Sequence, residues 1–216
     1  MQYPRSVILD MDEVLVQYSL PFGVYFCKKY GLPPPNSAGP DSFNMSKWLG
    51  ADKDLIQEEI LIFNSGEIDD FATPPPVPGA VAGVKYLLDR GASLHVVTSS
   101  AKTPRAKAMR KNTLDTVFGN GAFASVNVLE LGADKGGILA SFEPAIYVDD
   151  LMKNVLTGQS LGHTSVLMRA AHNSILFQTG EGLPEHAVQD WRDLISRIER
   201  GALEPPAPQF AQINIA

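Results

Sequence analysis

Short apolar runs alternate with amphipathic segments along most of this chain, which is the pattern of strands separated by helices. Apolar runs with the length of buried strands lie at 7–9, 93–97, 122–129, 145–148 and 164–168. Apolar residues at helical spacing predict helices at 80–90, 104–112, 133–142 and 184–200. Strands that alternate with helices form βαβ units. The sequence therefore predicts an α/β fold, with a Rossmann-like three-layer core around a parallel five-stranded sheet.

The alternation is interrupted between the first and second predicted strands. Helical spacing predicts helices at 20–30 and 52–64, and the segment 73–79 contains four prolines. Because proline continues neither a helix nor a central strand, this segment is predicted to be a hinge. The expected organisation is a core domain (1–17 and 75–204), a small helical insertion after the first strand (18–74) and a proline-rich tail, ordered only where it docks (205–216).

Composition narrows the classes of function. The 216 residues are 44% hydrophobic and 19% charged, which are ordinary values for a globular protein with a sizeable core. A net charge of −6 argues against a nucleic acid polymer as partner, because that affinity comes mostly from basic contacts to phosphates. The lone Cys27 can form no intramolecular disulfide, and no apolar run approaches the ~18 residues of a membrane span. With no signal-peptide pattern at the N-terminus, we expect a cytoplasmic protein without a membrane partner.

Two aspartates spaced two apart, Asp10 and Asp12, follow the first predicted strand. Side chains at i and i+2 point to the same side of an extended backbone, so both carboxylates can face one site. Two ionised carboxylates at such a short distance repel each other. One of them would therefore stay protonated unless a cation lay between them. A divalent metal ion is the simplest such cation. Turn chemistry at a strand end is the alternative explanation for this pair.

Two further predicted strands end in polar residues, Thr98-Ser99 and Asp149-Asp150. The carboxyl ends of parallel strands lie at one edge of the sheet, where ligands bind in open α/β folds. We therefore expect these residues to meet the two aspartates of the first strand. Taken singly, the threonine can simply end its strand, and the acidic pair can cap a helix.

These motifs, in this order, resemble those of the phosphatase branch of the haloacid dehalogenase superfamily. The residues that carry the resemblance are Asp10-Met11-Asp12-Glu13-Val14, Thr98, Lys135 and Asp149-Asp150. The resemblance implies a haloacid dehalogenase-like core with a helical cap inserted after the first strand. It also implies a phosphomonoester hydrolase that requires Mg²⁺.

The resemblance further implies a role for each acidic residue. Asp10 would attack phosphorus and form an aspartyl-phosphate, while Asp12 would act first as a general acid and then as a base. Mg²⁺ would bind Asp10, the backbone carbonyl of Asp12 and Asp149, with Asp150 as a further ligand or beside one.

The phosphoryl oxygens would be held by Thr98, Ser99 and a lysine. Lys135 is the candidate by motif order, although it precedes Asp149-Asp150 by only a short stretch of sequence. Some members of the superfamily take this lysine from the helix after the second motif, so the competitors are Lys107, Arg110 and Lys111.

A narrower resemblance is to the 5'(3')-deoxyribonucleotidase family. It rests on the first motif continued to Leu15, and on Pro78-Gly79-Ala80-Val81, Thr98-Ser99, Ala171-His172-Asn173 and Trp191-Arg192-Asp193-Leu194. It implies dephosphorylation of a (deoxy)nucleoside monophosphate. The chain departs from that family at two points. Leu151 stands where an arginine usually follows the paired acids, and the lysine expected after the second motif is displaced.

The insertion at 18–74 lies where the superfamily places its cap. It is large enough to close over a small substrate and expel water, which disfavours polymeric substrates. Most of its aromatic residues are expected to form the cap's own core. The candidates for contact with substrate are Phe22, Phe43 and Trp48.

The sequence thus predicts a Mg²⁺-dependent phosphomonoester hydrolase for a small phosphorylated metabolite, with a 5'-nucleotidase as the first hypothesis. The alternative within this chemistry is a phosphatase or phosphotransferase for a sugar phosphate or phosphoglycolate. The alternative of another class is a catalytically silent module that binds metal or phosphate. The choice between monomer and homodimer stays open.

Overall fold

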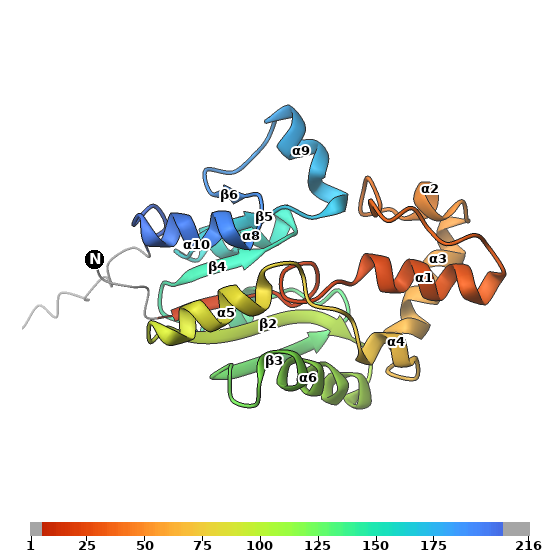
Figure 1. Ribbon diagram of the computed structural model, residues 1–216, viewed down its shortest axis with the longest axis horizontal. Helices are drawn as coiled ribbons and strands as arrows, with labels where there is room; N and C mark the ends of the chain where they lie inside the picture. The colour runs from red at the N-terminus through yellow and green to blue at the C-terminus, as the bar shows by residue number, and fades with distance from the viewer. Residues whose placement is uncertain (1–5, 205–216) are drawn as a thin grey trace, which may run out of the picture.

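The computed structural model describes residues 6–204, and its centre is a parallel six-stranded sheet (Figure 1). The strands run in the order β3-β2-β1-β4-β5-β6, and all neighbouring pairs are parallel. Their bounds are Ser6–Leu9 (β1), Ser93–Ala101 (β2), Ser125–Glu130 (β3), Ile146–Asp149 (β4), Thr164–Met168 (β5) and Ala187–Val188 (β6). The predicted α/β fold is confirmed, with one strand more than expected. Strand order reverses between β1 and β4, which is where such sheets bind ligands.

Helices cover both faces of this sheet and complete three layers. One face carries α5 (Ala80–Asp89), α6 (Pro104–Phe118) and α10 (Trp191–Glu199), and the other carries α7 (Gly136–Leu139) and α8 (Met152–Ser160). Alternate residues of β1 serve the two faces, because side chains alternate along a strand. Val7 and Leu9 pack with α5 and α10, whereas Ile8 packs with Leu139 of α7.

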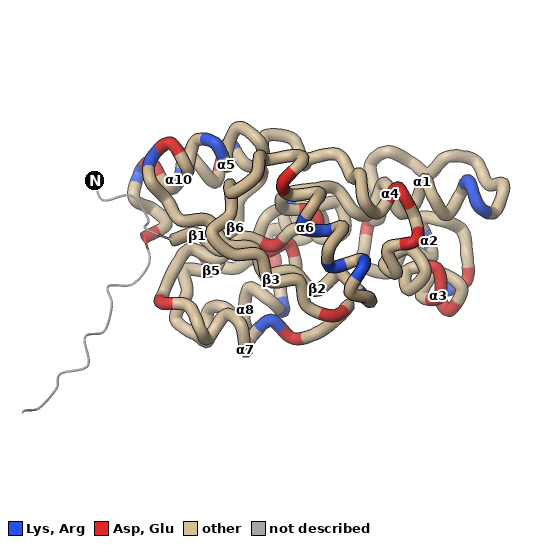
Figure 2. Tube along the Cα trace, turned by 90° about the horizontal axis from the view of Figure 1, so that it is seen from below, with Lys and Arg blue, Asp and Glu red and all other residues tan. Residues whose placement is uncertain are grey.

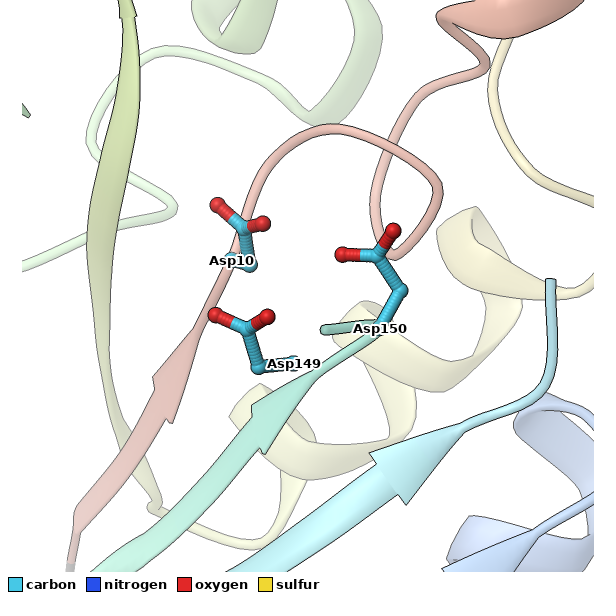
Figure 3. Close-up of side chains that lie close together, drawn as sticks. All are labelled: Asp10, Asp149 and Asp150. Carbon is cyan, nitrogen blue, oxygen red and sulfur yellow. The ribbon is translucent and has the colours of Figure 1, made fainter. Parts of the chain in front are cut away.

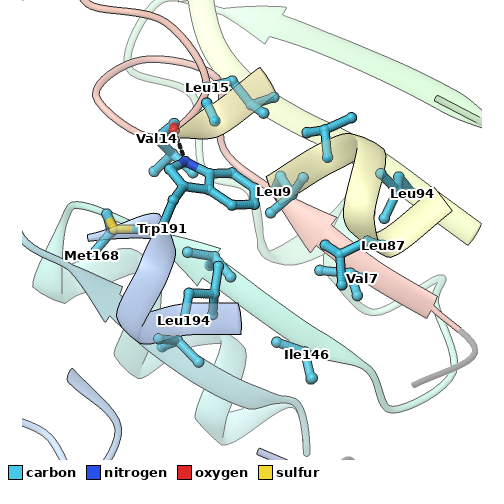
Figure 4. Close-up of a cluster of buried hydrophobic side chains, with 14 of the residues drawn as sticks. Val7, Leu9, Val14, Leu15, Leu87, Leu94, Ile146, Met168, Trp191 and Leu194 are labelled. Atoms are coloured by element: carbon cyan, nitrogen blue, oxygen red, sulfur yellow. Dashed lines mark hydrogen bonds between the residues drawn. The ribbon is translucent and has the colours of Figure 1, made fainter. Parts of the chain in front are cut away.

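Trp191 connects α10 to the loop that follows β1 (Figure 4). Its side chain is buried, and the indole Nε1 donates a hydrogen bond to the carbonyl of Val14 at 2.8 Å. Gly83 of α5 faces the indole, and a Cβ at that position would come within 2.1 Å of the ring. Glycine is therefore required for α5 to pack this closely. Through Trp191, two helices far along the chain fix the position of the first motif.

The sixth strand lies where the sequence pattern predicted the start of a helix. The helix expected at 184–200 forms only from Trp191, with Asp190 as its N-cap, and Ala187–Val188 pair with β5 instead. A strand of this length has no periodicity to detect, so the prediction of five strands was wrong at this point. The other helices not predicted in the core are α8, η1 (Ala171–Asn173) and α9 (Ser174–Thr179).

A helical segment leaves the core after β1 and returns before α5, and it lies beyond the carboxyl ends of the strands (Figure 1). It contains α1 (Ser19–Tyr30), α2 (Ser46–Leu49), α3 (Lys53–Phe63) and α4 (Asp69–Ala72). Its buried aromatic residues belong to a second apolar cluster, which also includes Ala101 of β2 and Ala106 of α6; they are Phe22, Tyr25, Phe26, Phe63 and Phe71. The place of this segment in the chain and in the fold is the one predicted for the insertion at 18–74, and residues 18–74 are called the cap below.

The two connections between core and cap run side by side. The amide of Gln17 donates to the carbonyl of Pro75 at 2.9 Å, and the amide of Val77 donates to the carbonyl of Leu15 at 3.0 Å. The predicted tail, 205–216, lies outside the described residues. Among residues 6–204, no helix is both long enough and apolar enough to cross a membrane.

Candidate active site

Three carboxylates from adjacent strand ends come together at the sheet edge below the cap (Figure 3). Asp10 follows β1, Asp149 ends β4, and Asp150 comes directly after it. One oxygen of each lies within 4.8 Å of the others, and all three residues are buried. They meet because β1 and β4 are paired in the sheet. The carboxylate of Asp12 is not part of this cluster, so its expected contact with a metal through the backbone carbonyl stays a prediction.

Lys135 directly precedes α7, and its side chain extends to this cluster. Its Nζ lies 2.8 Å from Oδ1 of Asp10 and 2.7 Å from Oδ2 of Asp149, and the side chain is 3% exposed. The competing Lys111 is exposed on α6. The structure therefore places Lys135, the lysine indicated by motif order, beside the two aspartates.

Two side chains, those of Asn154 and Tyr147, and the backbone amide of Leu151 hold Asp149 in place. The Nδ2 of Asn154 donates to both carboxylate oxygens at 3.0 and 3.1 Å, and the amide of Leu151 donates to Oδ1 at 2.8 Å. The hydroxyl of Tyr147 donates to Oδ2. Spacing was the available signal: Tyr147 lies two residues before Asp149 on the same strand, and Asn154 lies in the first turn of α8.

Asp150 is held from a different segment, the loop after β5. Nδ2 of Asn173 donates to the backbone carbonyl of Asp150 at 2.9 Å, and Nε2 of His172 lies 3.3 Å from its Oδ2. Burial lowers the pKa of His172. The narrower resemblance included this His172-Asn173 pair, and the structure brings it to the carboxylate cluster.

The buried charges at this site are unbalanced. Burial raises the pKa of Asp10 to about 6 from the usual 3.8, with Lys135 opposing the rise and Asp149 adding to it. Burial, and then repulsion from Asp149 and Asp10, raises the pKa of Asp150 well above its usual range. Burial alone would lower the pKa of Lys135, but attraction to the two aspartates outweighs it and the pKa is raised. Three carboxylates face one ammonium, and a further cation would compensate the excess negative charge.

The donor set of this cluster suits a hard divalent cation. Asp10, Asp149 and Asp150 offer carboxylate oxygens only, and such ligands favour Mg²⁺ or Ca²⁺ over metals that prefer nitrogen or sulfur. Since Asn154 and Leu151 already orient one of the three, part of the site is preorganised. These residues fit the metal site that the sequence predicts.

Asp12 projects to a different partner, a buried arginine of α6. The guanidinium of Arg110 donates to Oδ1 of Asp12, and the two side chains are 1% and 18% exposed respectively. The sequence reasoning considered Arg110 only as a competitor for the phosphate-binding position. No local signal connects these two residues, because they lie 98 positions apart.

Thr98 and Ser99 lie in the second half of β2, which continues to Ala101, and β2 lies on the opposite side of β1 from β4 in the strand order. Thr98 is buried and its Oγ1 lies 3.2 Å from Oγ of Ser100. The Oγ of Ser99 is buried and has no hydrogen-bond partner among the described residues. The pairing of β2 with β3 shifts register between Thr98 and Ala101, an irregularity of the kind that re-aims side chains beside binding sites.

A cavity of about 330 Å³ lies between these strand ends and the cap. Its floor is polar and includes Asp10, Asp150, Lys135 and Thr98. Its cap side is mostly apolar, and the residues there include Tyr18, Phe43, Met45 and Ile60. The cavity therefore presents charged groups at one end and an apolar wall at the other.

Of the three cap aromatics expected to contact substrate, Phe43 is the one that lines this cavity. Its side chain is 72% exposed and meets the ring of His172 edge-on, with 6.1 Å between ring centroids. Phe22 is fully buried among cap aromatics, and the indole of Trp48 packs over Gly23 and donates to the carbonyl of Asn36. Both serve the cap's own packing in this structure.

The comparisons with known proteins rest on structure, since no family model and no curated sequence matches the chain. A predicted phosphatase from Clostridium acetobutylicum matches with a TM-score of 0.63 at 15% identity, over 92% of this chain and 100% of that one. A haloacid dehalogenase-like hydrolase from Streptococcus pneumoniae matches with a TM-score of 0.62 at 15% identity, over 89% and 97%. A D,D-heptose 1,7-bisphosphate phosphatase from B. bronchiseptica, complexed with magnesium and phosphate, matches with a TM-score of 0.55 at 14% identity, over 91% and 99%. The chain shares its fold with haloacid dehalogenase-like hydrolases.

Proposed function

We propose that this protein is a Mg²⁺-dependent phosphomonoester hydrolase that acts through an aspartyl-phosphate on Asp10. The observation that carries the proposal is the position of Asp10, which lies at the floor of the cavity beside both Lys135 and the paired acids. A carboxylate there can reach a phosphoryl group that enters from the cap side. The fold shared with phosphatases supports the same reaction class.

The reaction would proceed in two displacements. An Asp10 oxygen attacks phosphorus while the bond from phosphorus to the ester oxygen breaks, and Asp12 gives its proton to the departing oxygen. Water then attacks phosphorus and loses a proton to Asp12, the bond from phosphorus to Asp10 breaks, and inorganic phosphate leaves. Lys135 and the hydroxyls of Thr98 and Ser99 would hold the phosphoryl oxygens throughout.

Asp10, Asp149 and the backbone carbonyl of Asp12 would hold Mg²⁺, with Asp150 as a further ligand or beside one. The ion would supply positive charge that keeps the carboxylates ionised and offsets the charge of the phosphoryl group. The magnesium and phosphate in the structure of the heptose bisphosphate phosphatase support this choice of ion.

The cavity favours a small substrate with one phosphate and an uncharged remainder that includes a planar group. Its volume is at the lower end of the about 300–1,000 Å³ usual for ligand sites. The basic residues that line it are Lys135, Lys153 and His172, and Lys135 is already paired with aspartates. The Phe43 side offers an apolar face to a planar group, whereas a polyol there would lose hydrogen bonds to water.

We therefore infer that a (deoxy)nucleoside monophosphate is the preferred substrate, ahead of a sugar phosphate or phosphoglycolate. Lys and Arg positions are spread among acidic ones along the described chain (Figure 2), in keeping with a small ligand rather than a polymer. The buried, unpaired Cys27 agrees with the expected cytoplasmic location.

A screen of phosphorylated metabolites tests both levels of the proposal. Phosphate release is measured from nucleoside 5'- and 3'-monophosphates, sugar phosphates, phosphoglycolate and p-nitrophenyl phosphate, with Asp10→Asn as the control. We expect phosphate release from nucleoside monophosphates. EDTA should abolish this release and added Mg²⁺ should restore it. Release without metal, or equal release by Asp10→Asn, would refute the mechanism. A preference for phosphoglycolate would refute only the substrate, and no release from any compound would favour the silent module.

A further inference from the structure

Arg110 is a buried arginine behind the cavity whose charge is directed at Asp12. It lies on α6, its side chain is 1% exposed, and its guanidinium donates to Oδ1 of Asp12. The residues that line the cavity include Asp12 but not Arg110. A bound substrate would therefore meet the carboxylate and not the guanidinium.

The surroundings of Arg110 hold it in this position. The guanidinium carbon lies 4.9 Å from the ring centroid of Phe71, on helix α4 of the cap. One turn further along α6, the hydroxyl of Thr113 donates to the carbonyl of Ala72 at 2.7 Å, which ties α6 to the end of α4. A buried charge is costly unless it is paired, and within residues 6–204 Asp12 is the acidic partner of Arg110.

The pair leaves one carboxylate oxygen of Asp12 available. The bond from Arg110 goes to Oδ1, while Oδ2 has no hydrogen bond within the described part of the chain. The terminal torsion of an aspartate side chain is broad and weakly restrained, so a free Asp12 would sample many orientations of its carboxylate. A fixed Oδ1 removes that freedom and leaves Oδ2 for the cavity.

We infer that Arg110 is a positioning residue for the general acid and base of this enzyme: it fixes Oδ1 of Asp12 so that Oδ2 faces the ester oxygen of the substrate. The inference rests on the proposed function, in which Asp12 protonates the leaving group and then accepts a proton from water. Arg110 does not line the cavity, and it binds the side-chain carboxylate of Asp12 rather than the backbone carbonyl proposed as a ligand of Mg²⁺.

A positioning role predicts a specific dependence on the leaving group. Protonation matters most when the departing oxygen is strongly basic, as in phenyl phosphate, and little for the good leaving group of p-nitrophenyl phosphate. The two esters have nearly the same shape, so they form a matched pair. The ratio kcat/KM reports the steps up to release of the alcohol, whereas kcat also includes attack by water, for which Asp12 is the base.

The test compares Arg110→Met, which keeps an unbranched stem without the charge, with Arg110→Lys, which keeps the charge. Lys111→Met is the control, because it removes a neighbouring exposed charge from the same helix. General acid–base catalysis contributes about 10²–10⁴-fold, so we expect Arg110→Met to lower kcat/KM for phenyl phosphate by about 10- to 100-fold. We expect a change of less than about 3-fold for p-nitrophenyl phosphate, a burst of p-nitrophenolate before slower turnover, and partial rescue in Arg110→Lys.

A double variant separates positioning from other roles. If Arg110 acts through Asp12, then Arg110→Met should add nothing to the loss that Asp12→Asn already causes with phenyl phosphate. Equal losses for both esters together with weaker inhibition by inorganic phosphate would show that Arg110 contacts phosphate, and would refute the inference. So would normal kinetics in a folded Arg110→Met.

The outcome also distinguishes this inference from the proposed function. A wild-type protein that releases phosphate from no phosphomonoester refutes the function, and the inference fails with it. An active wild type whose Arg110 variants do not separate the two esters refutes the inference alone. Should Arg110→Met fail to fold, Arg110→Lys allows the same comparison, because a lysine shifts the contact without removing the buried charge.

Discussion

Replacing Lys135 with methionine tests whether the buried ammonium stabilises the paired aspartates and contributes to catalysis. Methionine keeps an unbranched side chain and removes the charge. The Nζ of Lys135 lies 2.8 Å from Asp10 and 2.7 Å from Asp149, and neither carboxylate has another basic side chain in an ion pair within residues 6–204. The substitution would therefore leave two buried carboxylates without a positive partner.

The cost in stability follows from this loss of a partner. Removing one member of a buried ion pair costs about 3–5 kcal/mol, and we expect Lys135→Met to lose that much in EDTA at pH 7.5. The pKa of Lys135 is raised by its two partners, so its charge and its stabilising effect are fully present at that pH. At pH 5 the loss should be smaller, because Asp10, whose pKa is about 6, is then mostly protonated.

The cost in catalysis is expected to be of a similar order. Removing one group that stabilises charge in a transition state typically lowers kcat by about 10²–10³-fold, and we expect such a loss for Lys135→Met with saturating Mg²⁺. Turnover of p-nitrophenyl phosphate measures the loss of catalysis, and urea unfolding followed by tryptophan fluorescence measures the loss of stability.

Lys111→Met is the matched control, since it removes an exposed lysine that sequence reasoning had left as a competitor. We expect it to leave both measurements close to wild type. A severe loss of turnover in Lys111→Met, with normal turnover in Lys135→Met, would refute the assignment of Lys135. Normal stability of Lys135→Met in EDTA at pH 7.5 would refute the electrostatic reasoning.

Two further predictions concern the nucleophile and the cap. The pKa of Asp10 is raised, so its contribution to the stability of the metal-free protein is present below about pH 3.8 and is lost as the pH rises through about 6. Asp10→Asn should abolish turnover and flatten this pH dependence in urea unfolding, and an unchanged dependence would contradict the raised pKa. Phe43→Ala should raise KM for the preferred substrate without a large change in stability, because Phe43 is exposed to the cavity. Phe22→Ala should instead cost about 3–5 kcal/mol, as for other buried aromatics, and a raised KM in Phe22→Ala with an unchanged one in Phe43→Ala would reverse their assigned roles.

The order of apolar runs and the residues at their ends were enough to predict the core fold and the sheet edge at which Asp10, Asp149 and Asp150 meet. Local patterns suffice here because βαβ connections allow few topologies, and parallel strands bring their carboxyl ends to the same edge. For this reason Asp10 and Asp149 could be placed together from the sequence, although the strands β1 and β4 are far apart along it. The two-residue β6 could not be predicted, because its pairing with β5 involves the main chain and leaves no side-chain pattern.

The partner of each charge was decided only by the tertiary structure. The sequence offered four basic candidates for one position, and packing buries Lys135 against the aspartates, leaves Lys111 exposed and directs Arg110 to Asp12. Helical spacing likewise shows that a cap face is apolar but not which surface it meets, so Phe22 and Phe43 could not be told apart. Sequence patterns record local backbone preference and the polarity of a face. Contacts between segments far apart in the chain depend on how the elements pack, and those contacts determine the charge balance and the shape of this site.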